Sequence, residues 1–168
     1  MFGQTQHNLV RRETDIGLIP PSLVTDFHAY WLAKRGTWAL PSWSDIDPSE
    51  IKRLLPNLIV AGVEYDPLRI RYRLAGTMIV EFRGEITGHY LGQIPWSSPK
   101  GQATVLEGFT RNITERIPLF NEVEIATRHG ARRKIFTGVW PLAPRDDAPI
   151  DRCVAIEDYG NLTRDELA

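Results

Sequence analysis

Apolar and basic residues alternate along residues 69–74, and this period of two predicts a β-strand with one buried face. The apolar members, which we expect to face the core, are Ile70, Tyr72 and Leu74. The basic members, which we expect to face outward, are Arg69, Arg71 and Arg73. Gly76 then ends the strand, and the hydroxyl of Thr77 is placed to cap a following helix. The stretch therefore predicts a corner between a strand and a helix.

Residues 23–35 form an amphipathic stretch, which predicts a helix that begins after Ser22 and ends at Gly36. Ser22, after two prolines, is a helix cap, and Gly36 follows a cationic last turn formed by Lys34 and Arg35. The apolar residues that share one face of this helix are Leu23, Phe27, Tyr30 and Trp31. Such a stripe needs a partner surface, which is either the body of the same chain or a second copy.

Two further helices are predicted from their opening residues. Asp47 followed by Pro48 opens a short helix that ends at Pro56, and Ser98 followed by Pro99 opens the longest one. Gly108 inside the long helix costs about 1 kcal/mol relative to alanine. The glycine is explained either by close approach of a strand or ligand, or by chance.

The remaining apolar runs predict strands joined by hairpins. With the opening stretch, the expected strands lie at residues 58–63, 69–74, 119–125, 134–142 and 150–159. This order of elements predicts an α+β fold, with a five-stranded antiparallel sheet and helices packed on one face. We divide the chain into a flexible N-terminal arm (1–19), a helical extension (20–57), a core (58–160) and a C-terminal tail (161–168).

Composition indicates one globular domain and excludes several classes of function. The 168 residues are 42% hydrophobic and 24% charged, which are average values for soluble domains. A net charge of −1 gives no overall attraction for nucleic acid. Cys153 is the only cysteine, so neither an intrachain disulfide nor a cysteine cluster for zinc can form. Without a signal peptide or an apolar span, we expect a cytoplasmic protein with no membrane contact.

Several ordered motifs resemble the bacterial single-domain PAS family, which was once catalogued as a domain of unknown function. The motifs are Tyr30-Trp31, residues 41–48, Leu54-Leu55-Pro56, residues 71–77, Thr87-Gly88 and Pro141-Leu142. The resemblance runs from about residue 24 to about residue 159, so it covers nearly the whole chain. It agrees with the order of strands and helices predicted above.

The resemblance implies a non-enzymatic sensor or protein-interaction module. PAS domains bind small molecules between the sheet and the helices, or dimerise and relay signals through the sheet and flanking helices. The sequence ends at Ala168, soon after the last predicted strand, so we expect the signal to pass in trans to another protein. We also expect a homodimer, formed through the first helix.

No pattern of residues indicates catalysis or a metal site. The histidines His7, His28, His89 and His129 are not spaced as metal ligands, and the nucleophile and phosphate-loop motifs are absent. Glu122 and Glu124 share a strand face with charged neighbours, which is typical of a solvated surface. The alternative is a small enzyme whose pocket uses Tyr72, Asn121 or His89.

The two cofactors best known from PAS domains are both disfavoured. Haem-binding members supply a histidine from the long helix, and residues 98–116 contain none. Flavin photoreceptors place a reactive cysteine in the helical region, whereas Cys153 falls on the last strand. We therefore predict no cofactor.

The candidate site residues follow from the expected faces of the strands and helices. The ligand-binding candidates are Tyr72, Leu74, Ile79, Phe82, Phe109, Ile113, Asn121, Val123, Phe136 and Val139. The partner-binding candidates are Tyr30, Trp31, Arg71 and Arg73. A buried amide at Asn121 needs hydrogen-bond partners, which backbone, water or ligand can supply. The arginines either deter mispairing at a sheet edge or bind an acidic partner.

Overall fold

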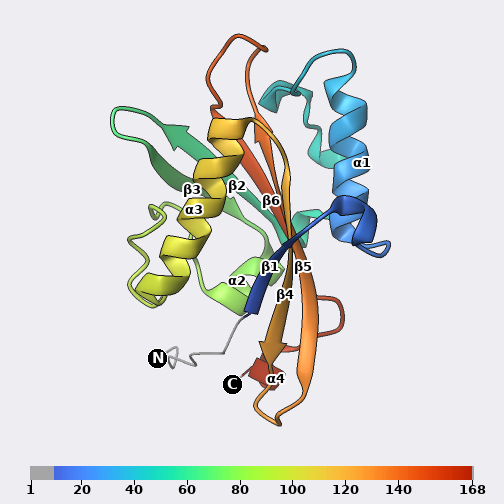
Figure 1. Cartoon of the computed structure of the whole chain (residues 1–168), viewed down its shortest axis with the longest axis vertical. Helices are drawn as coiled ribbons and strands as arrows, with labels where there is room; N and C mark the ends of the chain where they lie inside the picture. The colour runs from blue at the N-terminus through green and yellow to red at the C-terminus, as the bar shows by residue number, and fades with distance from the viewer. Residues whose placement is uncertain (1–9, 168) are drawn as a thin grey trace.

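The computed structural model describes residues 10–167, which form an antiparallel sheet of six strands with helices on both faces (Figure 1). The strands are β1 (Val10–Thr14), β2 (Leu58–Glu64), β3 (Arg69–Ala75), β4 (Leu119–Ala126), β5 (Arg132–Leu142) and β6 (Arg152–Asp158). The helices are α1 (Leu23–Arg35), α2 (Thr77–Arg83), α3 (Pro99–Glu115) and α4 (Arg164–Leu167). The strands lie in the order β1-β4-β5-β6-β2-β3, so the predicted α+β class is confirmed. Within these residues no helix combines the length and the apolar character needed to cross a membrane.

One strand lies in the segment predicted as a flexible arm. Residues 1–9 of that arm fall outside the described residues, but Val10–Thr14 pairs with β4, with Val10 opposite Glu124 and Thr14 opposite Phe120. The sequence VRRET has no apolar alternation, and four of its five residues carry polar side chains. The prediction was therefore wrong for these residues, because backbone pairing to a distant strand orders them.

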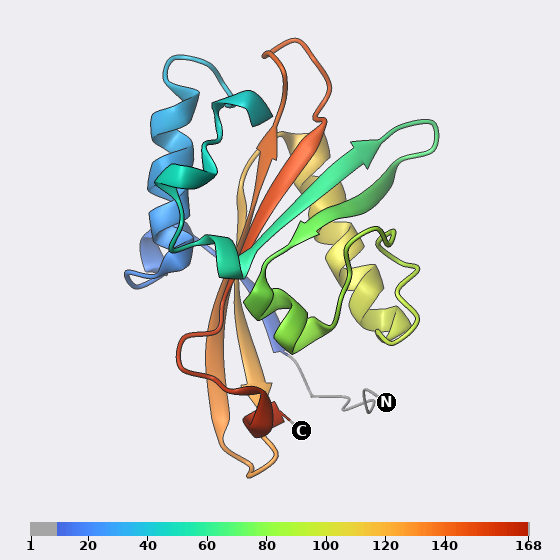
Figure 2. The same cartoon turned by 180° about the vertical axis from the view of Figure 1, so that it is seen from behind.

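The helices divide between the two faces of the sheet. Helices α2 and α3 lie on one face, as predicted, and α1 of the N-terminal extension lies on the other, against β5 and β6 (Figures 1 and 2). Of its apolar residues Val24, Phe27 and Trp31 are buried, and the ring of Phe27 lies 4.7 Å from that of Trp140. The Trp31 indole donates to the Pro141 carbonyl at 3.1 Å. Packing within one chain is thus confirmed for this stripe, and these side chains cannot also form a dimer seam.

The end signals of α1 and the cap at Asp47 were predicted correctly, whereas the length of the element after Asp47 differs. The Ser22 side chain accepts the Thr25 amide, and Gly36 ends the helix at a φ of 55°. The predicted helix after Asp47 is only a 3₁₀ turn, Pro48–Glu50, because the chain leaves helical geometry at Ile51.

Helix α2 begins at a glycine rather than at the predicted threonine cap. Gly76 is the N-cap residue, and no side chain caps the first turn of α2. A Cβ at Gly76 would lie 2.1 Å from the carbonyl oxygen of Leu55, so only glycine fits there. Close approach of two backbones therefore replaces the capping role expected for Thr77.

A β-bulge in β3 changes the face of the sheet on which the side chains after Tyr72 lie. Val60 is opposite Leu74, but Ala61 is opposite Tyr72, so Arg73 is the extra residue. Ile70 and Tyr72 are buried at 1% exposure, whereas Leu74 is 46% exposed and shares the face of Val60. The expectation that Leu74 lines the core with Tyr72 was therefore wrong.

The outer edge of β3 is covered by another part of the same chain. The Tyr72 amide donates to the His89 carbonyl at 3.0 Å, and the Gly88 amide donates to the Tyr72 carbonyl at 2.8 Å. The Leu91 amide donates to the Ile70 carbonyl at 2.9 Å. Backbone pairing as well as charge therefore protects this last strand of the sheet.

Candidate functional site

A cavity of about 250 Å³ lies between α3 and the face of the sheet that α3 covers. Its polar and charged lining comes from Arg11, Glu13, Arg83, Thr104, Glu107, Arg111, Asn121, Thr137 and Glu157. The remaining lining comes from Ile59, Val105, Gly108, Phe109, Gly138, Val139, Ala155 and Ile156. Every strand except β3 contributes, together with α2 and α3, so the cavity forms only when the whole sheet is assembled.

The interior end of the cavity holds an ion pair. The Arg83 guanidinium, at the end of α2, lies 2.9 Å from the Glu157 carboxylate on β6, and the two side chains are 29% and 12% exposed. The Tyr159 hydroxyl donates to the same carboxylate, and its ring stacks on Phe82 at 4.0 Å. The negative charge of Glu157 raises the pKa of Arg83 above its ordinary value. Charged side chains rather than apolar ones therefore line this end of the cavity.

Arg11 brings a second positive charge to the same cavity from β1. Its guanidinium donates to the Thr137 hydroxyl at 3.4 Å, and within residues 10–167 it makes no ion pair. Burial lowers the pKa of Arg11, and the charge of Glu157 opposes that effect while the charge of Arg83 adds to it. Arg11, Arg83 and Glu157 thus share one electrostatic environment, with one positive charge in excess.

The hydroxyl of Tyr72 belongs to this cluster and makes no hydrogen bond to a described residue. Tyr72 is 1% exposed. Burial raises the pKa of its phenol, and the charges of Arg83 and Arg11 act in the opposite direction. A buried hydroxyl without a partner costs about 1 to 3 kcal/mol. The Tyr72 hydroxyl thus lies outside the cavity lining and has no acceptor among the described residues.

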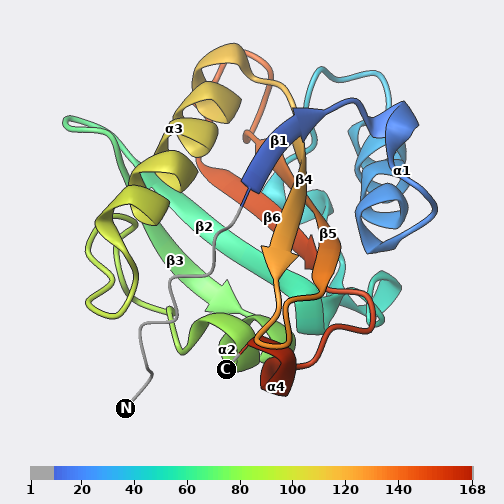
Figure 3. The same ribbon diagram turned by 60° about the horizontal axis from the view of Figure 1, so that its bottom comes forward.

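The exposed part of the cavity lining comes from β1 and α3, which lie near one another (Figure 3). Its exposed residues are Glu13 on β1 and Thr104 and Glu107 on α3, and Arg111 on α3 is partly exposed. Arg111 forms an ion pair with Glu13 in this exposed part, and a second one with Glu115 at 3.1 Å. A Cβ at Gly108 would have no atom within 4 Å outside the backbone of its own helix. The glycine thus leaves space beside the cavity, and no close contact with a strand requires it.

The structure separates the predicted ligand-binding residues into four groups, of which three lie on the cavity side of the sheet. Phe109, Asn121 and Val139 line the cavity. The hydroxyl of Tyr72 joins the charged cluster, as described above. The side chains of Ile79, Ile113 and Val123 are buried in the core outside the cavity lining, and Phe82 packs on Tyr159.

Leu74 and Phe136 lie on the opposite face of the sheet. Phe136 shares its face with Trp140, which contacts α1. Predicting Phe136 and Val139 for one wall was an error, because strand residues three positions apart point to opposite faces. The sequence analysis also missed Arg11, Arg83 and Glu157, and the isolated charges give no local pattern that marks them as cavity residues.

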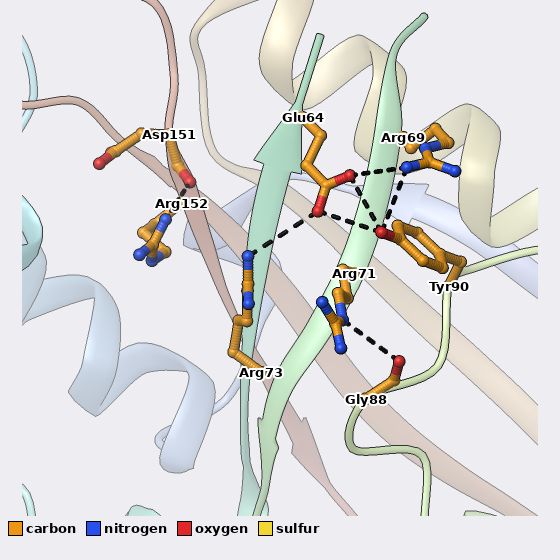
Figure 4. A network of polar contacts seen from close by, with 8 residues as sticks. All are labelled: Glu64, Arg69, Arg71, Arg73, Gly88, Tyr90, Asp151 and Arg152. Atoms are coloured by element: carbon orange, nitrogen blue, oxygen red, sulfur yellow. Dashed lines mark hydrogen bonds and ion pairs between the residues drawn. The ribbon is translucent and has the colours of Figure 1, made fainter.

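A second feature is a cluster of guanidinium groups on the other face of the sheet. Gly62 of β2 is opposite Arg71 on β3 and opposite Arg152 on β6. The Arg73 side chain crosses Gly62, where a Cβ would lie 2.8 Å from its Nε atom, and reaches Glu64 at 3.8 Å (Figure 4). We call Arg71, Arg73 and Arg152 the arginine patch.

Neighbouring contacts hold the arginine patch in place. Arg69 forms an ion pair with Glu64 at 3.1 Å and lies 4.3 Å from the centre of the Tyr90 ring. Arg71 donates to the Gly88 carbonyl at 3.3 Å. Glu64 is the acid that pairs with this group within residues 10–167, so the positive charge of the patch is only partly balanced.

Two of the four predicted partner-binding residues belong to the arginine patch. Arg73 is exposed and Arg71 is partly exposed. Tyr30 is partly buried and donates to Glu50 at 2.9 Å, and Trp31 is only 3% exposed. Trp31 was therefore wrongly predicted to bind a partner, because its face of α1 packs on the sheet.

The described residues hold no metal cluster, and they place only one of the three residues named for the enzyme alternative in the cavity. Over residues 10–167 no three potential ligands gather as a metal site. Asn121 lines the cavity, whereas Tyr72 and His89 are not part of its lining. The His89 ring lies instead 5.2 Å from that of Trp96.

Cys153 does not fit the reactive thiol of a flavin photoreceptor. Its Sγ atom donates to the Asn112 side chain at 3.2 Å, it is buried, and it does not line the cavity. Burial raises the pKa of this thiol, so the reactive thiolate is disfavoured. The absence of a bound flavin or haem remains a prediction, which the visible absorbance of the purified protein tests.

Comparisons with known proteins gave alignments to solved structures and a match to a family model. A search of curated proteins found no match. A light-state structure of the blue-light photoreceptor Aureochrome1 LOV aligns with 14% identity and a TM-score of 0.38, over 70% of this chain and 89% of that one. A light-oxygen-voltage domain studied with a flavin analogue aligns with 12% identity and a TM-score of 0.42, over 67% and 84%. A sensory box histidine kinase/response regulator from Burkholderia thailandensis E264 aligns with 15% identity and a TM-score of 0.35, over 67% and 84%.

These TM-scores are too low to carry an argument about ligands. The sequence itself matches the family model described as PAS domain over residues 20–152, which is most of the chain. The match includes α1, which covers the outer face of the sheet, as well as α2, α3 and the four strands from β2 to β5. The chain therefore belongs to the PAS domain family.

Proposed function

We propose that this PAS domain is a non-enzymatic sensor, which binds one small molecule in the cavity and signals through a protein partner in trans. One observation carries the proposal: the cavity contains charged groups, among them the Arg11 guanidinium, which forms no ion pair within residues 10–167. Charged groups removed from water are usually paired in native proteins, and a ligand would supply the missing partner. The membership of the PAS domain family supports the same interpretation.

We propose the arginine patch as the surface that meets the partner. Arg71, Arg73 and Arg152 lie on the face of the sheet opposite the cavity, at the side that α1 leaves uncovered (Figures 2 and 4). Guanidinium groups bind carboxylates with two parallel hydrogen bonds, so an acidic segment of another protein is the partner of matching chemistry. The strands β2 and β6 connect this surface to the cavity wall, since alternate residues of each strand reach the two faces.

A homodimer remains part of the proposal, although not through the buried stripe of α1. Leu32 is 40% exposed and Trp38 is 62% exposed, so apolar side chains are still available near the end of α1. Light scattering by the purified protein at micromolar concentration tests this point. A mass of two chains supports the proposed dimer, and a mass of one chain contradicts it.

Native mass spectrometry of the protein as isolated tests the sensor proposal. We expect a mass above that of the chain under native conditions, and its loss when the same sample is denatured. The Gly108→Leu variant is the comparison, because its side chain would enter the space beside the cavity. A retained molecule that is unchanged in this variant would place the ligand elsewhere and contradict the proposal.

Crosslinking in cell extract tests the proposed partner surface. A charge-reversed variant, Arg73→Glu with Arg152→Glu, is compared with Arg12→Glu, whose side chain is 60% exposed on β1. We expect one acidic protein to crosslink to the wild type and to the Arg12→Glu variant, and not to the charge-reversed one. Equal crosslinking by all three proteins would exclude the arginine patch.

A further inference from the structure

We infer that the ligand of the cavity is a small monocarboxylate, whose carboxylate lies against Arg11 and the Thr137 hydroxyl and whose apolar part lies against α3. This inference rests on the proposed function and adds the chemical class of the ligand. It follows from the charge, the hydrogen-bonding groups and the size of the cavity.

The charge of the cavity selects a monoanion. Of its interior charged groups, Arg83 and Glu157 neutralise each other at 2.9 Å, which leaves the positive charge of Arg11. In the exposed part of the lining, Arg111 pairs with Glu13, and Glu107 adds a solvent-exposed carboxylate. A monoanion would neutralise Arg11, a cation would add to its charge, and a dianion would place excess negative charge beside Glu157. Buried charges are stable when they are paired, so the monoanion fits best.

The hydrogen-bonding groups select an acceptor. The guanidinium of Arg11 makes one long hydrogen bond, to the Thr137 hydroxyl at 3.4 Å, and both groups line the cavity. A carboxylate accepts from a guanidinium and from a hydroxyl at the same time. An ammonium group would instead lie beside the positive charge of Arg11.

The volume and the apolar walls of the cavity limit the size and the polarity of the ligand beyond its carboxylate. At about 30 Å³ for each water-sized group, the cavity holds about eight such groups. Ile59, Val105, Phe109, Val139 and Ala155 form apolar walls beside the charged end. A short carboxylic acid with an unbranched or cyclic apolar part fits both conditions. Hexanoate, which has eight non-hydrogen atoms, is the probe that we choose.

Isothermal titration calorimetry with four probes tests the inference on the full chain. The probes are hexanoate, hexan-1-ol, hexylammonium and inorganic phosphate. We expect hexanoate to bind at least tenfold more tightly than hexan-1-ol, because the alcohol lacks the charge that Arg11 requires. We expect no binding of hexylammonium or phosphate. Equal binding of hexanoate and hexan-1-ol would overturn the inference.

Three variants locate the bound carboxylate. Arg11→Gln should weaken hexanoate binding by about tenfold to a hundredfold. Arg12→Gln is the matched control on the same strand, since that side chain is 60% exposed, and it should leave binding unchanged. Gly108→Leu should abolish binding while a circular dichroism melt shows a folded protein. Equal effects of Arg11→Gln and Arg12→Gln, or full binding by Gly108→Leu, would overturn the inference.

The outcomes separate this inference from the proposed function. If no probe binds but native mass spectrometry finds a retained molecule that Gly108→Leu loses, the cavity is a ligand site and the monocarboxylate inference is wrong. If no probe binds and no molecule is retained, both are wrong. If hexanoate binds with the expected dependence on Arg11, both stand.

Discussion

Arg83 at the end of α2 and Glu157 on β6 form an ion pair of 2.9 Å inside the cavity, where the hydroxyl of Tyr159 also reaches Glu157. The pair links α2 to β6 at the charged part of the cavity lining. Glu157 is the only acid of the cluster that it forms with Arg11 and Arg83 within residues 10–167. Its pairing with Arg83 therefore leaves the positive charge of Arg11 unbalanced. The stability of the domain and its choice of ligand therefore depend on the same few groups.

The Glu157→Gln substitution should destabilise the domain by about 3 kcal/mol, because it leaves two positive charges in a poorly solvated cavity. Urea unfolding followed by fluorescence measures the change. Glu115→Gln is the control, since its side chain is 45% exposed in an ion pair with Arg111, and it should cost less than about 1 kcal/mol. Equal losses in the two variants would show that the Arg83 pair behaves as a surface pair.

Replacement of two buried tyrosines by phenylalanine should have opposite effects on stability. Tyr72→Phe removes a hydroxyl that has no partner among the described residues, so we expect the ligand-free protein to gain about 1 kcal/mol. Tyr159→Phe removes a hydroxyl that donates to Glu157, so we expect a loss of about 1 kcal/mol. Denaturant midpoints of the two variants, measured without ligand, decide the matter. A loss of stability in Tyr72→Phe would reveal a partner for that hydroxyl.

Two glycines next to helical structure should respond in opposite ways to alanine. Gly76→Ala places a Cβ 2.1 Å from the Leu55 carbonyl oxygen and should cost about 3 kcal/mol or more. Gly108→Ala meets no such obstacle in α3 and should gain about 0.5 to 1 kcal/mol from helix propensity. Thermal melts of both variants test this pair. Similar losses in both would contradict the open space described beside Gly108.

The protein should lose stability in mild acid because of His28. Its Nδ1 atom accepts the Trp140 indole N–H at 3.1 Å, and burial, with the charge of Arg35, lowers the pKa of His28. The unfolded chain therefore binds a proton more readily, at an ordinary pKa of about 6.5. This contribution to stability is complete above about pH 6.5 and is lost as the pH falls through the lower, folded-state value.

Urea unfolding between about pH 7.5 and about pH 5 measures this dependence in the wild type and in His28→Gln. The variant should show a smaller decrease in stability towards acid, because glutamine can accept the indole N–H without taking up a proton. His129→Gln is the control at an exposed histidine and should follow the wild type. A steeper decrease in His28→Gln than in the wild type would reverse the sign that we assign.

Elements with local end signals were predicted well, and elements defined by distant pairing were not. Ser22 and Gly36 mark α1 because caps and stops act within a few residues of the helix. The strand at residues 69–75 was predicted from its alternation, but the bulge that exposes Leu74 arises from its pairing with Val60 and Ala61. Neither strand carries a local sign of that bulge.

The candidate site was less predictable than the fold for a similar reason. Phe109, Asn121 and Val139 were found from helical or strand periodicity, which identifies residues that face the interior. Arg11 reaches the interior only because β1 pairs with β4, more than a hundred positions away along the chain. In the sequence, Arg83 is a basic residue in the last turn of a helix, where such residues are common. Only the folded sheet brings Glu157 close to it. Chemistry that depends on such contacts cannot be read from local pattern.

The side-chain NMR signal of Arg11 tests the central claim most directly. In a ¹⁵N-labelled sample, the Nε–H resonance of Arg11 is assigned by its loss in Arg11→Gln, and hexanoate is then added. We predict a large shift and slower solvent exchange for this resonance, with no change for Arg12 on the same strand. If the Arg11 resonance stays in place while hexanoate binds, or moves no more than that of Arg12, the cavity is not the carboxylate site that we describe.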